Sequence, residues 1–186
     1  MKNKKTQMAK STGHSLLSGI GILTMFLFIS SCSSTKKTMS NDGMGMHRNN
    51  STVAAFVAYV DANNKMLPDH SYINNALVKL ADATNAMAGE INYTITPDLN
   101  KAKDFANKIT QDANETTHSD NIRKSAEILS DALQNMQRSK YPGLSSSATE
   151  LKGNADAITS NVLVHNQQAA IATFLKNSAS LLQKMN

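Results

Sequence analysis

The sequence predicts an all-α fold, an antiparallel up-and-down helical bundle of about five to six helices spanning residues 52–186. Three observations predict it. Apolar residues recur at alternating steps of three and four, which places them on one face of a helix. The segments between these stripes are short, as they are between antiparallel neighbours. Residues 91–95 are the only candidate for a strand, and that run is short.

The first two predicted helices differ in the regularity of their apolar stripes. A short amphipathic stretch begins at Val53 and stops near Leu67 and Pro68, because proline cannot continue a helix. The second helix is more regular, and Asp69 is placed to cap its start. Its stripe steps by 4, 3, 4, 3 and 4 through Ile73, Leu77, Leu80, Thr84, Met87 and Ile91. We expect one face of this helix to be buried.

Start signals mark the third and fourth predicted helices. Thr96 supplies a capping hydroxyl, Pro97 a proline at the first helical position, and Asp98 an acid near the positive end of the helix dipole. The fourth helix is predicted to begin near Thr117 to Asp120, at capping-box spacing, and to end at residues 141–143. The apolar positions are Leu99, Ala102, Ala106, Ile109 and Ala113, then Ile122, Ala126, Leu129, Leu133 and Met136.

The last two predicted helices continue this pattern. The fifth carries a stripe from Leu144 to Val162, and Ser147 and Glu150 stand at capping-box spacing within it. The sixth holds apolar residues over 171–185. Alanine at many seam positions allows close approach of neighbouring helices. Several stripes also carry Asn, Ser and Thr, so we expect stability to come from burial of the seams rather than from helix propensity.

The first 32 residues predict export and lipid attachment. The first 15 residues hold four lysines and no acid, and an apolar run of 14 residues follows, from Leu16 to Ile29. A membrane-spanning helix needs roughly 20 apolar residues, so this run is more typical of a signal peptide. The segment Ile29-Ser30-Ser31-Cys32 then resembles the lipobox of bacterial lipoproteins.

This resemblance covers only about the first 35 residues. It implies that residues 1–31 are a lipoprotein signal peptide, removed on export, and that Cys32 carries a diacylglycerol and an N-acyl group. Cys32 is the only cysteine, so an intrachain disulfide is excluded. Ser33 follows it in place of aspartate, which by the same resemblance points to the outer membrane. No acidic run signals display outside the cell, so we expect a lipid-anchored envelope protein that faces the periplasm.

Residues 32–51 are predicted to be a lipidated, flexible tether, because they are polar, rich in Gly, Ser and Asn, and without periodicity. A coil of this length places the domain on the order of 25 Å from the bilayer. The net charge of +5 includes four lysines of the signal peptide, and their removal leaves 15 basic and 14 acidic residues. Because the remaining charges are interspersed, we expect no nucleic-acid partner.

The sequence lacks the motifs of common catalytic chemistry, and we expect no enzyme. It contains no GxxxxGK[ST], HExxH, GxSxG or CxxC, and no GxGxxG after a strand. We also expect no di-iron site of the kind that bundles build from Glu-x-x-His pairs. The function that we predict first is a non-enzymatic interaction or ligand-binding module. It would bind another envelope protein, a peptide or a small ligand such as a lipid in a groove between helices.

The alternative function is an envelope metal-binding protein for copper or zinc. Met44, Met46 and His47 form, with Met39, a cluster of soft donors in the tether, of the kind that Cu(I) favours. Methionine in a flexible linker also occurs without any metal, so this cluster leaves both interpretations open.

A second candidate metal site follows from helix alternation. The start of the second helix, the start of the fourth and the end of the fifth should lie at one end of the bundle, and His70, His118 and His165 stand at these positions. Asp69 and Asp120 neighbour two of them, and carboxylate beside imidazole is typical of Zn(II) and Cu(II) sites. Polar helix ends also collect histidine and aspartate as caps, and no H-x-x-x-H pair supports chelation.

Overall fold

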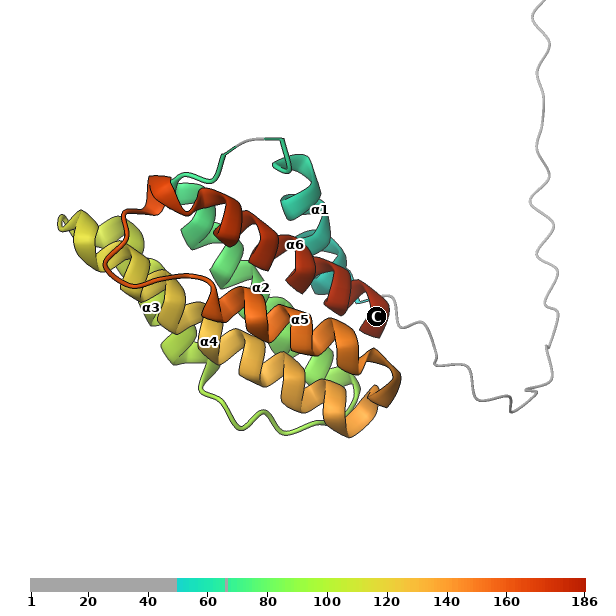
Figure 1. Ribbon diagram of the computed structural model, residues 1–186. Helices are drawn as coiled ribbons and strands as arrows, with labels where there is room; N and C mark the ends of the chain where they lie inside the picture. Colours follow the sequence, from blue (N-terminus) through green and yellow to red (C-terminus); the bar gives the residue numbers. More distant parts are fainter. Residues whose placement is uncertain (1–49, 66) are drawn as a thin grey trace, which may run out of the picture. The chain divides into compact units, whose positions relative to one another are not determined.

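The computed structural model describes residues 50–65 and 67–186, which form six α-helices and two short 3-10 helices and contain no strand (Figure 1). The elements in chain order are α1 (Ser51–Ala62), α2 (His70–Glu90), α3 (Leu99–Gln111), α4 (Glu115–Lys140), η1 (Pro142–Leu144), α5 (Ser145–Asp156), η2 (Val164–Asn166) and α6 (Gln168–Met185). The predicted all-α fold is confirmed. Within the described ranges, no helix is long and apolar enough to cross a membrane.

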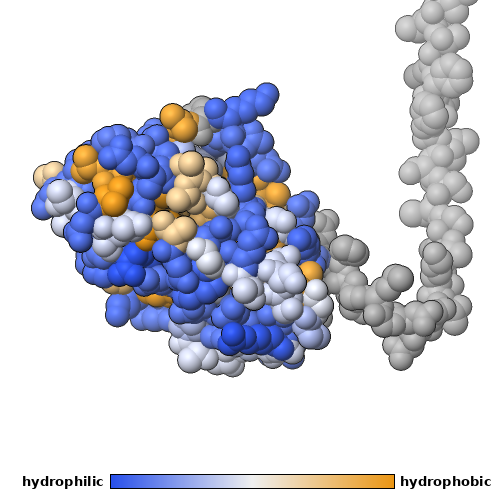
Figure 2. Space-filling view, in the orientation of Figure 1, coloured by the Kyte–Doolittle hydropathy of each residue, from blue (hydrophilic) through white to orange (hydrophobic). Residues whose placement is uncertain are grey.

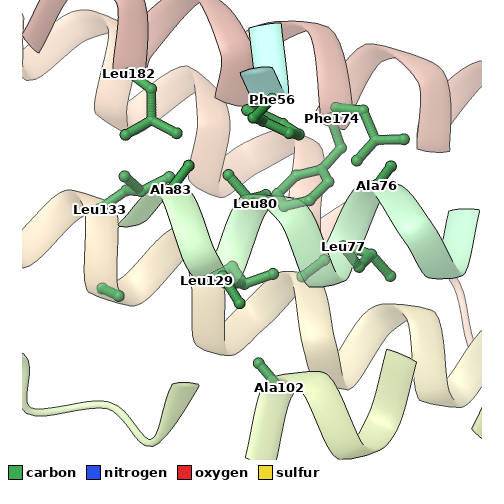
Figure 3. Close-up of a cluster of buried hydrophobic side chains, with 14 of the residues drawn as sticks. Phe56, Ala76, Leu77, Leu80, Ala83, Ala102, Leu129, Leu133, Phe174 and Leu182 are labelled. Carbon is green, nitrogen blue, oxygen red and sulfur yellow. The ribbon is translucent and has the colours of Figure 1, made fainter. Parts of the chain in front are cut away.

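Each α-helix packs against the next one along the chain, as in an up-and-down bundle, and α1 also packs against α6. Helix α2 is central, because it contacts α4 and α6 as well as its neighbours in sequence. Figure 3 shows Leu80 of α2 between Phe174 of α6 and Leu129 of α4, and all three side chains are fully buried. The core is therefore built around α2.

The predicted apolar stripes of α2 and α4 face this core. Every stripe residue of α4 is fully buried, and the stripe of α2 is buried along its whole length, with Ile91 the most exposed at 8%. The stripe predicted for α3 is buried from Leu99 to Ile109, but Ala113 is exposed because the helix ends at Gln111. Burial of these seams removes apolar surface from water and stabilises the bundle.

The starts of α3 and α4 differ from the prediction. Asp98 caps α3, because its carboxylate accepts hydrogen bonds from the backbone N–H groups of Asn100 and Lys101 at 3.0 and 3.2 Å. Thr96 and Pro97 therefore lie before the helix. Helix α4 begins at Glu115 with Asn114 as its cap, earlier than the predicted start at Thr117 to Asp120. The Asn114 side chain accepts from the backbone N–H of Thr116, which satisfies a donor of the first turn.

The two ends of the described domain meet. Asn50 caps α1, so Ser51, which the sequence analysis placed in the tether, is helical. The backbone N–H of Asn50 donates to Asn186 Oδ1 at 2.7 Å, and the Asn50 side chain donates to Glu90 at 2.6 Å. Helix α1 ends at Ala62, before the predicted stop at Leu67 and Pro68.

The strand candidate, residues 91–95, ends helix α2 instead. Asn92 adopts a positive φ of 50°, and the backbone N–H of Tyr93 donates to the carbonyl of Ala88 at 2.9 Å. Asparagine is one of the few residues other than glycine that visits this left-handed region at low cost. The segment is therefore a helix-terminating turn.

Helix α5 is shorter than its predicted stripe, and it begins without a side-chain cap. The predicted capping box is wrong, because Ser147 and Glu150 bond to α6. Ser147 Oγ accepts from Lys184 at 3.0 Å, and a Glu150 carboxylate oxygen accepts from Asn177 at 2.9 Å. These contacts join α5 to α6 along their exposed edge.

The connection from α5 to α6 is organised by the buried side chain of Gln167. Its carbonyl oxygen accepts from the backbone N–H of Thr159 at 2.9 Å, and its amide donates to the backbone carbonyls of Thr159 and Val162 at 3.0 and 2.9 Å. Asn161, within this segment, has a φ of 62°. Val162 thus lies in a loop, and His165 lies in η2 rather than at the end of the fifth helix.

Candidate metal centre

His70, Glu115 and His118 meet at one end of the bundle. One ligand atom from each of the three side chains lies within 4.8 Å of the other two. His70 is the first residue of α2, and the other two residues stand in the first turns of α4. In Figure 1 the start of α2 and the connection between α3 and α4 lie at the same, left-hand end of the bundle. The up-and-down alternation of the helices therefore brings the starts of α2 and α4, and with them His70 and His118, together as predicted.

The two imidazole rings are in direct contact. Their centroids lie 4.6 Å apart at an interplanar angle of 71°, an edge-to-face arrangement. His118 is 6% exposed, whereas one third of the His70 side chain is exposed. The two histidines therefore form the more buried side of the cluster. Solvent reaches the cluster from the side of Glu115, whose side chain is 57% exposed.

One hydrogen bond orients the ring of His118. Its Nε2 lies 2.9 Å from the backbone carbonyl oxygen of Asp112. A carbonyl only accepts, so Nε2 carries the proton and the neutral ring keeps its lone pair on Nδ1. That Nδ1 atom is buried and has no hydrogen-bond partner. A histidine that donates one ring N–H to a carbonyl and offers the other nitrogen is the usual arrangement of a metal ligand.

His70 presents a second buried nitrogen. Its Nε2 has no hydrogen-bond partner, and the closest carboxylate oxygen, Glu115 Oε1, lies 3.9 Å away, beyond hydrogen-bond distance. A buried polar atom without a partner costs free energy, so two of them on rings in direct contact call for an explanation.

The loop between α3 and α4 holds this geometry through side-chain bonds. Asp112 accepts from the hydroxyl of Thr117 at 2.6 Å and from the backbone N–H of Asn114 at 3.0 Å. Asn114 in turn caps α4, so Glu115 and His118 start the helix three residues apart. Residues three apart on a helix lie on one face, which explains why both side chains point to His70.

These bonds also keep Asp112 charged. The hydrogen bond from Thr117 first, and that from Asn114 second, hold the pKa of Asp112 below its ordinary value, and the proximity of His118 adds to the effect. The carboxylate is therefore ionised at neutral pH. A negative charge next to the cluster, in addition to Glu115, favours a cation there.

The remaining residues named in the sequence analysis have other positions. His165 is exposed in η2 and is not part of the cluster. Asp69 caps α2 by accepting from the backbone N–H of Tyr72, and Asp120 accepts from Lys124 at 2.6 Å. Neither aspartate belongs to the cluster. Cys32, Met44, Met46 and His47 lie outside the described residues.

Sequence reasoning missed Glu115. Glu115 and His118 have Glu-x-x-His spacing, and this signal was passed over when a di-iron site was excluded. A helix that began near Thr117 would have left Glu115 outside it, so the two side chains would not have shared a face. A di-iron bundle combines two such pairs with two further glutamates, whereas the cluster in the described residues contains one pair and His70.

The donor set determines which ions suit the cluster. Two imidazole nitrogens and one carboxylate oxygen suit Zn(II) and other borderline divalent ions, whereas Cu(I) prefers sulfur. Ligands about 2.0–2.2 Å from one ion lie roughly 3.3 Å apart in tetrahedral geometry, closer than the present 4.8 Å limit. The Glu115 side chain is 57% exposed, so its rotation would bring the carboxylate closer to an ion held by the two imidazoles.

Comparisons with protein-family models, with curated proteins and with solved structures found no match to this chain.

Proposed function

We propose that this protein is an envelope lipoprotein whose helical domain binds a divalent transition-metal ion, zinc(II) by preference, at His70, Glu115 and His118. The observation that carries the proposal is the pair of buried imidazole nitrogens without hydrogen-bond partners, His118 Nδ1 and His70 Nε2, on two rings that form one cluster with the Glu115 carboxylate. Ion binding would convert two unsatisfied polar atoms into ligands, and the Asp112 carbonyl already selects the required tautomer of His118.

The proposed role is binding rather than catalysis. An ion held here joins the start of α2 to the start of α4, which are distant in sequence. Such a link stabilises the folded chain by an amount that grows with the logarithm of the ratio of ion concentration to dissociation constant.

The proposed location in the cell envelope rests on the amino-terminal sequence. Cys32 would carry the lipid, the residues between Cys32 and the Asn50 cap of α1 would form the tether, and the domain would face the periplasm from the outer membrane. The domain then acts as a tethered metal-binding module, without a nucleic-acid partner.

A second candidate function is the interaction module without metal. The observation that favours it is a groove of about 310 Å³ between α1 and α6, lined by Val53, Ala54, Val57, Ala58, Asp61, Gln183 and Asn186. A peptide or another envelope protein would place an apolar side chain there. Crosslinking in intact envelopes followed by affinity capture tests this function, and substitution of Ala58 by arginine should abolish the captured species.

Calorimetric titration of the metal-stripped protein with zinc tests the metal proposal. We expect one ion per chain, and a loss of affinity of at least tenfold on His118→Ala and on His70→Ala, since even outer-shell partners of metal ligands contribute 10- to 100-fold. His165→Ala is the matched control, because it removes an exposed histidine of η2 and should leave the affinity unchanged. Equal losses in all three variants, or no saturable binding, would refute the site.

A further inference from the structure

Three lysine side chains converge on one phenylalanine on the outer surface of α3 and α4. The ammonium groups of Lys101, Lys108 and Lys124 lie 6.0, 5.4 and 5.4 Å from the centroid of the Phe105 ring. Lys101 and Lys108 stand one helical turn before and after Phe105 on α3, and Lys124 reaches across from α4. We call these four residues the lysine–phenylalanine patch.

The positive charge of the patch is only partly balanced. Among the described residues, no carboxylate lies within ion-pair distance of Lys101 or Lys108, whereas Lys124 pairs with Asp120 at 2.6 Å. Asp104 is exposed beside Phe105 and forms no ion pair with Lys101 or Lys108. Cation–π contacts hold the lysines over the ring without neutralising them. The ammonium groups of Lys101 and Lys108 therefore stay available to an anionic partner.

Phe105 adds an apolar centre to this charged surface. Its side chain is half-buried and packs outside the seam of α3, whose core positions are Ala102, Ala106 and Ile109. Elsewhere the surface is largely hydrophilic on the face shown in Figure 2, and Leu67 is the exposed large apolar residue of the described ranges. An aromatic ring surrounded by lysines is the composition of segments that lie at the interface of an anionic membrane.

We propose that the lysine–phenylalanine patch docks the domain on the anionic headgroups of the bilayer that carries its lipid anchor. The inference rests on the proposed anchor at Cys32, but it does not depend on metal binding. A patch with two unpaired lysines is too weak to hold a soluble protein on a membrane. A tethered domain meets the surface at a high effective concentration, so a weak contact suffices to orient it.

The reach of the tether allows this contact. The proposed tether, residues 32–49, which ends before the Asn50 cap of α1, places the domain on the order of 25 Å from the bilayer as a coil. Fully extended, such a segment spans about 60 Å, at roughly 3.3 Å per residue. The domain can therefore turn the outer surface of α3 toward the headgroups while its first residue stays tethered.

Hydrogen–deuterium exchange of the full chain, purified from cell membranes and reconstituted in vesicles, tests the proposal. One vesicle set contains phosphatidylcholine alone, and the other contains one third phosphatidylglycerol. We expect residues 99–111 to exchange more slowly in the anionic vesicles only. Lys101→Gln with Lys108→Gln should remove this protection, because each lysine changes surface partitioning about fivefold.

The matched control is Lys140→Gln with Lys176→Gln, which changes the charge equally at two exposed positions outside the patch. It should keep the protection. Equal exchange in both vesicle sets, or equal loss of protection in both double variants, would overturn the docking proposal. Flotation with the phosphatidylcholine vesicles reports the lipid anchor alone. If the anchor fails, hydrogen–deuterium exchange of residues 99–111 in a large excess of anionic vesicles, with and without the two patch substitutions, still decides whether the patch binds headgroups.

Discussion

His118 and His70 hold their imidazole rings edge to face, with centroids 4.6 Å apart, although they belong to helices that are separated by the whole of α3. Each ring keeps one buried nitrogen without a hydrogen-bond partner. This relationship connects the fold to the proposed function, because a bundle of alternating helices brings the two rings together and a single metal ion would use both nitrogens.

Zinc should stabilise the chain against heat. At a zinc concentration of 100 times the dissociation constant, binding contributes about 2.7 kcal/mol, which raises Tm by on the order of 10 °C for a domain of this size. Differential scanning calorimetry measures the shift with and without zinc. The shift should disappear in His118→Ala and persist in His165→Ala. A shift of equal size in both variants would place the ion elsewhere.

Asp120 should contribute stability that depends on pH. The hydrogen bond from Lys124, then that from Ser160, holds the pKa of Asp120 below its ordinary value of 3.8. A lowered folded-state pKa means that the stabilisation is present above pH 3.8 and is lost as the pH falls through the folded-state value. Asp120→Asn should therefore lower the free energy of unfolding at pH 7, by less than about 1 kcal/mol for this half-exposed pair.

Urea unfolding at pH 7 and at pH 3 measures this effect, with Asp61→Asn as an exposed control. The difference between the wild type and Asp120→Asn should shrink at the lower pH. A difference that stays constant between the two pH values would contradict the assigned role of Asp120.

Leu80 should be essential for folding. It is fully buried between α4 and α6 (Figure 3), so Leu80→Ala should cost about 2–5 kcal/mol of unfolding free energy. Leu80→Asp should unfold the domain, because it buries a carboxylate without a partner. Circular dichroism during urea unfolding measures both. The control is Leu67→Ala, at a position that is 73% exposed, where we expect a change within about 0.5 kcal/mol. Similar losses at both positions would contradict the core described here.

Cys32 should be acylated in the mature protein. This prediction concerns a residue outside the described ranges and rests on the lipobox-like segment and the apolar run before it. Mass spectrometry of the protein from cell membranes should find residues 1–31 absent and the cysteine modified. Cys32→Ser should release the protein from the membrane fraction, whereas the neighbouring Ser33→Ala should not. An intact amino terminus or an unmodified thiol would refute the anchor.

The fold could be predicted from the sequence because its apolar stripes are regular. The cap at Asp69 and the buried stripe of α2 agree with the structure along the whole helix. The predicted start of α4 is too late, since the run of polar residues from Asn114 to Asn121 offers several alternative caps and only the folded loop shows that Asn114 is used. With the helix start predicted a few residues too late, Glu115 lies outside the helix and is not identified as a partner of His118.

The candidate site could be predicted only in part from the sequence. Helix alternation predicts that His70 and His118 approach each other, and their ring contact agrees with it. The position of His165 depends on the loop that Gln167 organises through three hydrogen bonds, and such a loop carries no periodic signal. The lysine–phenylalanine patch was missed because its third lysine comes from another helix.

Zinc K-edge X-ray absorption of the zinc-loaded full chain tests the central claim most directly. The account predicts a shell of nitrogen and oxygen at about 2.0–2.2 Å with the outer-shell scattering of two imidazole rings. His70→Ala and His118→Ala should each remove one ring from that signal, and His165→Ala should remove none. A spectrum without imidazole scattering, or one that the first two substitutions leave unchanged, would contradict a metal centre at His70, Glu115 and His118.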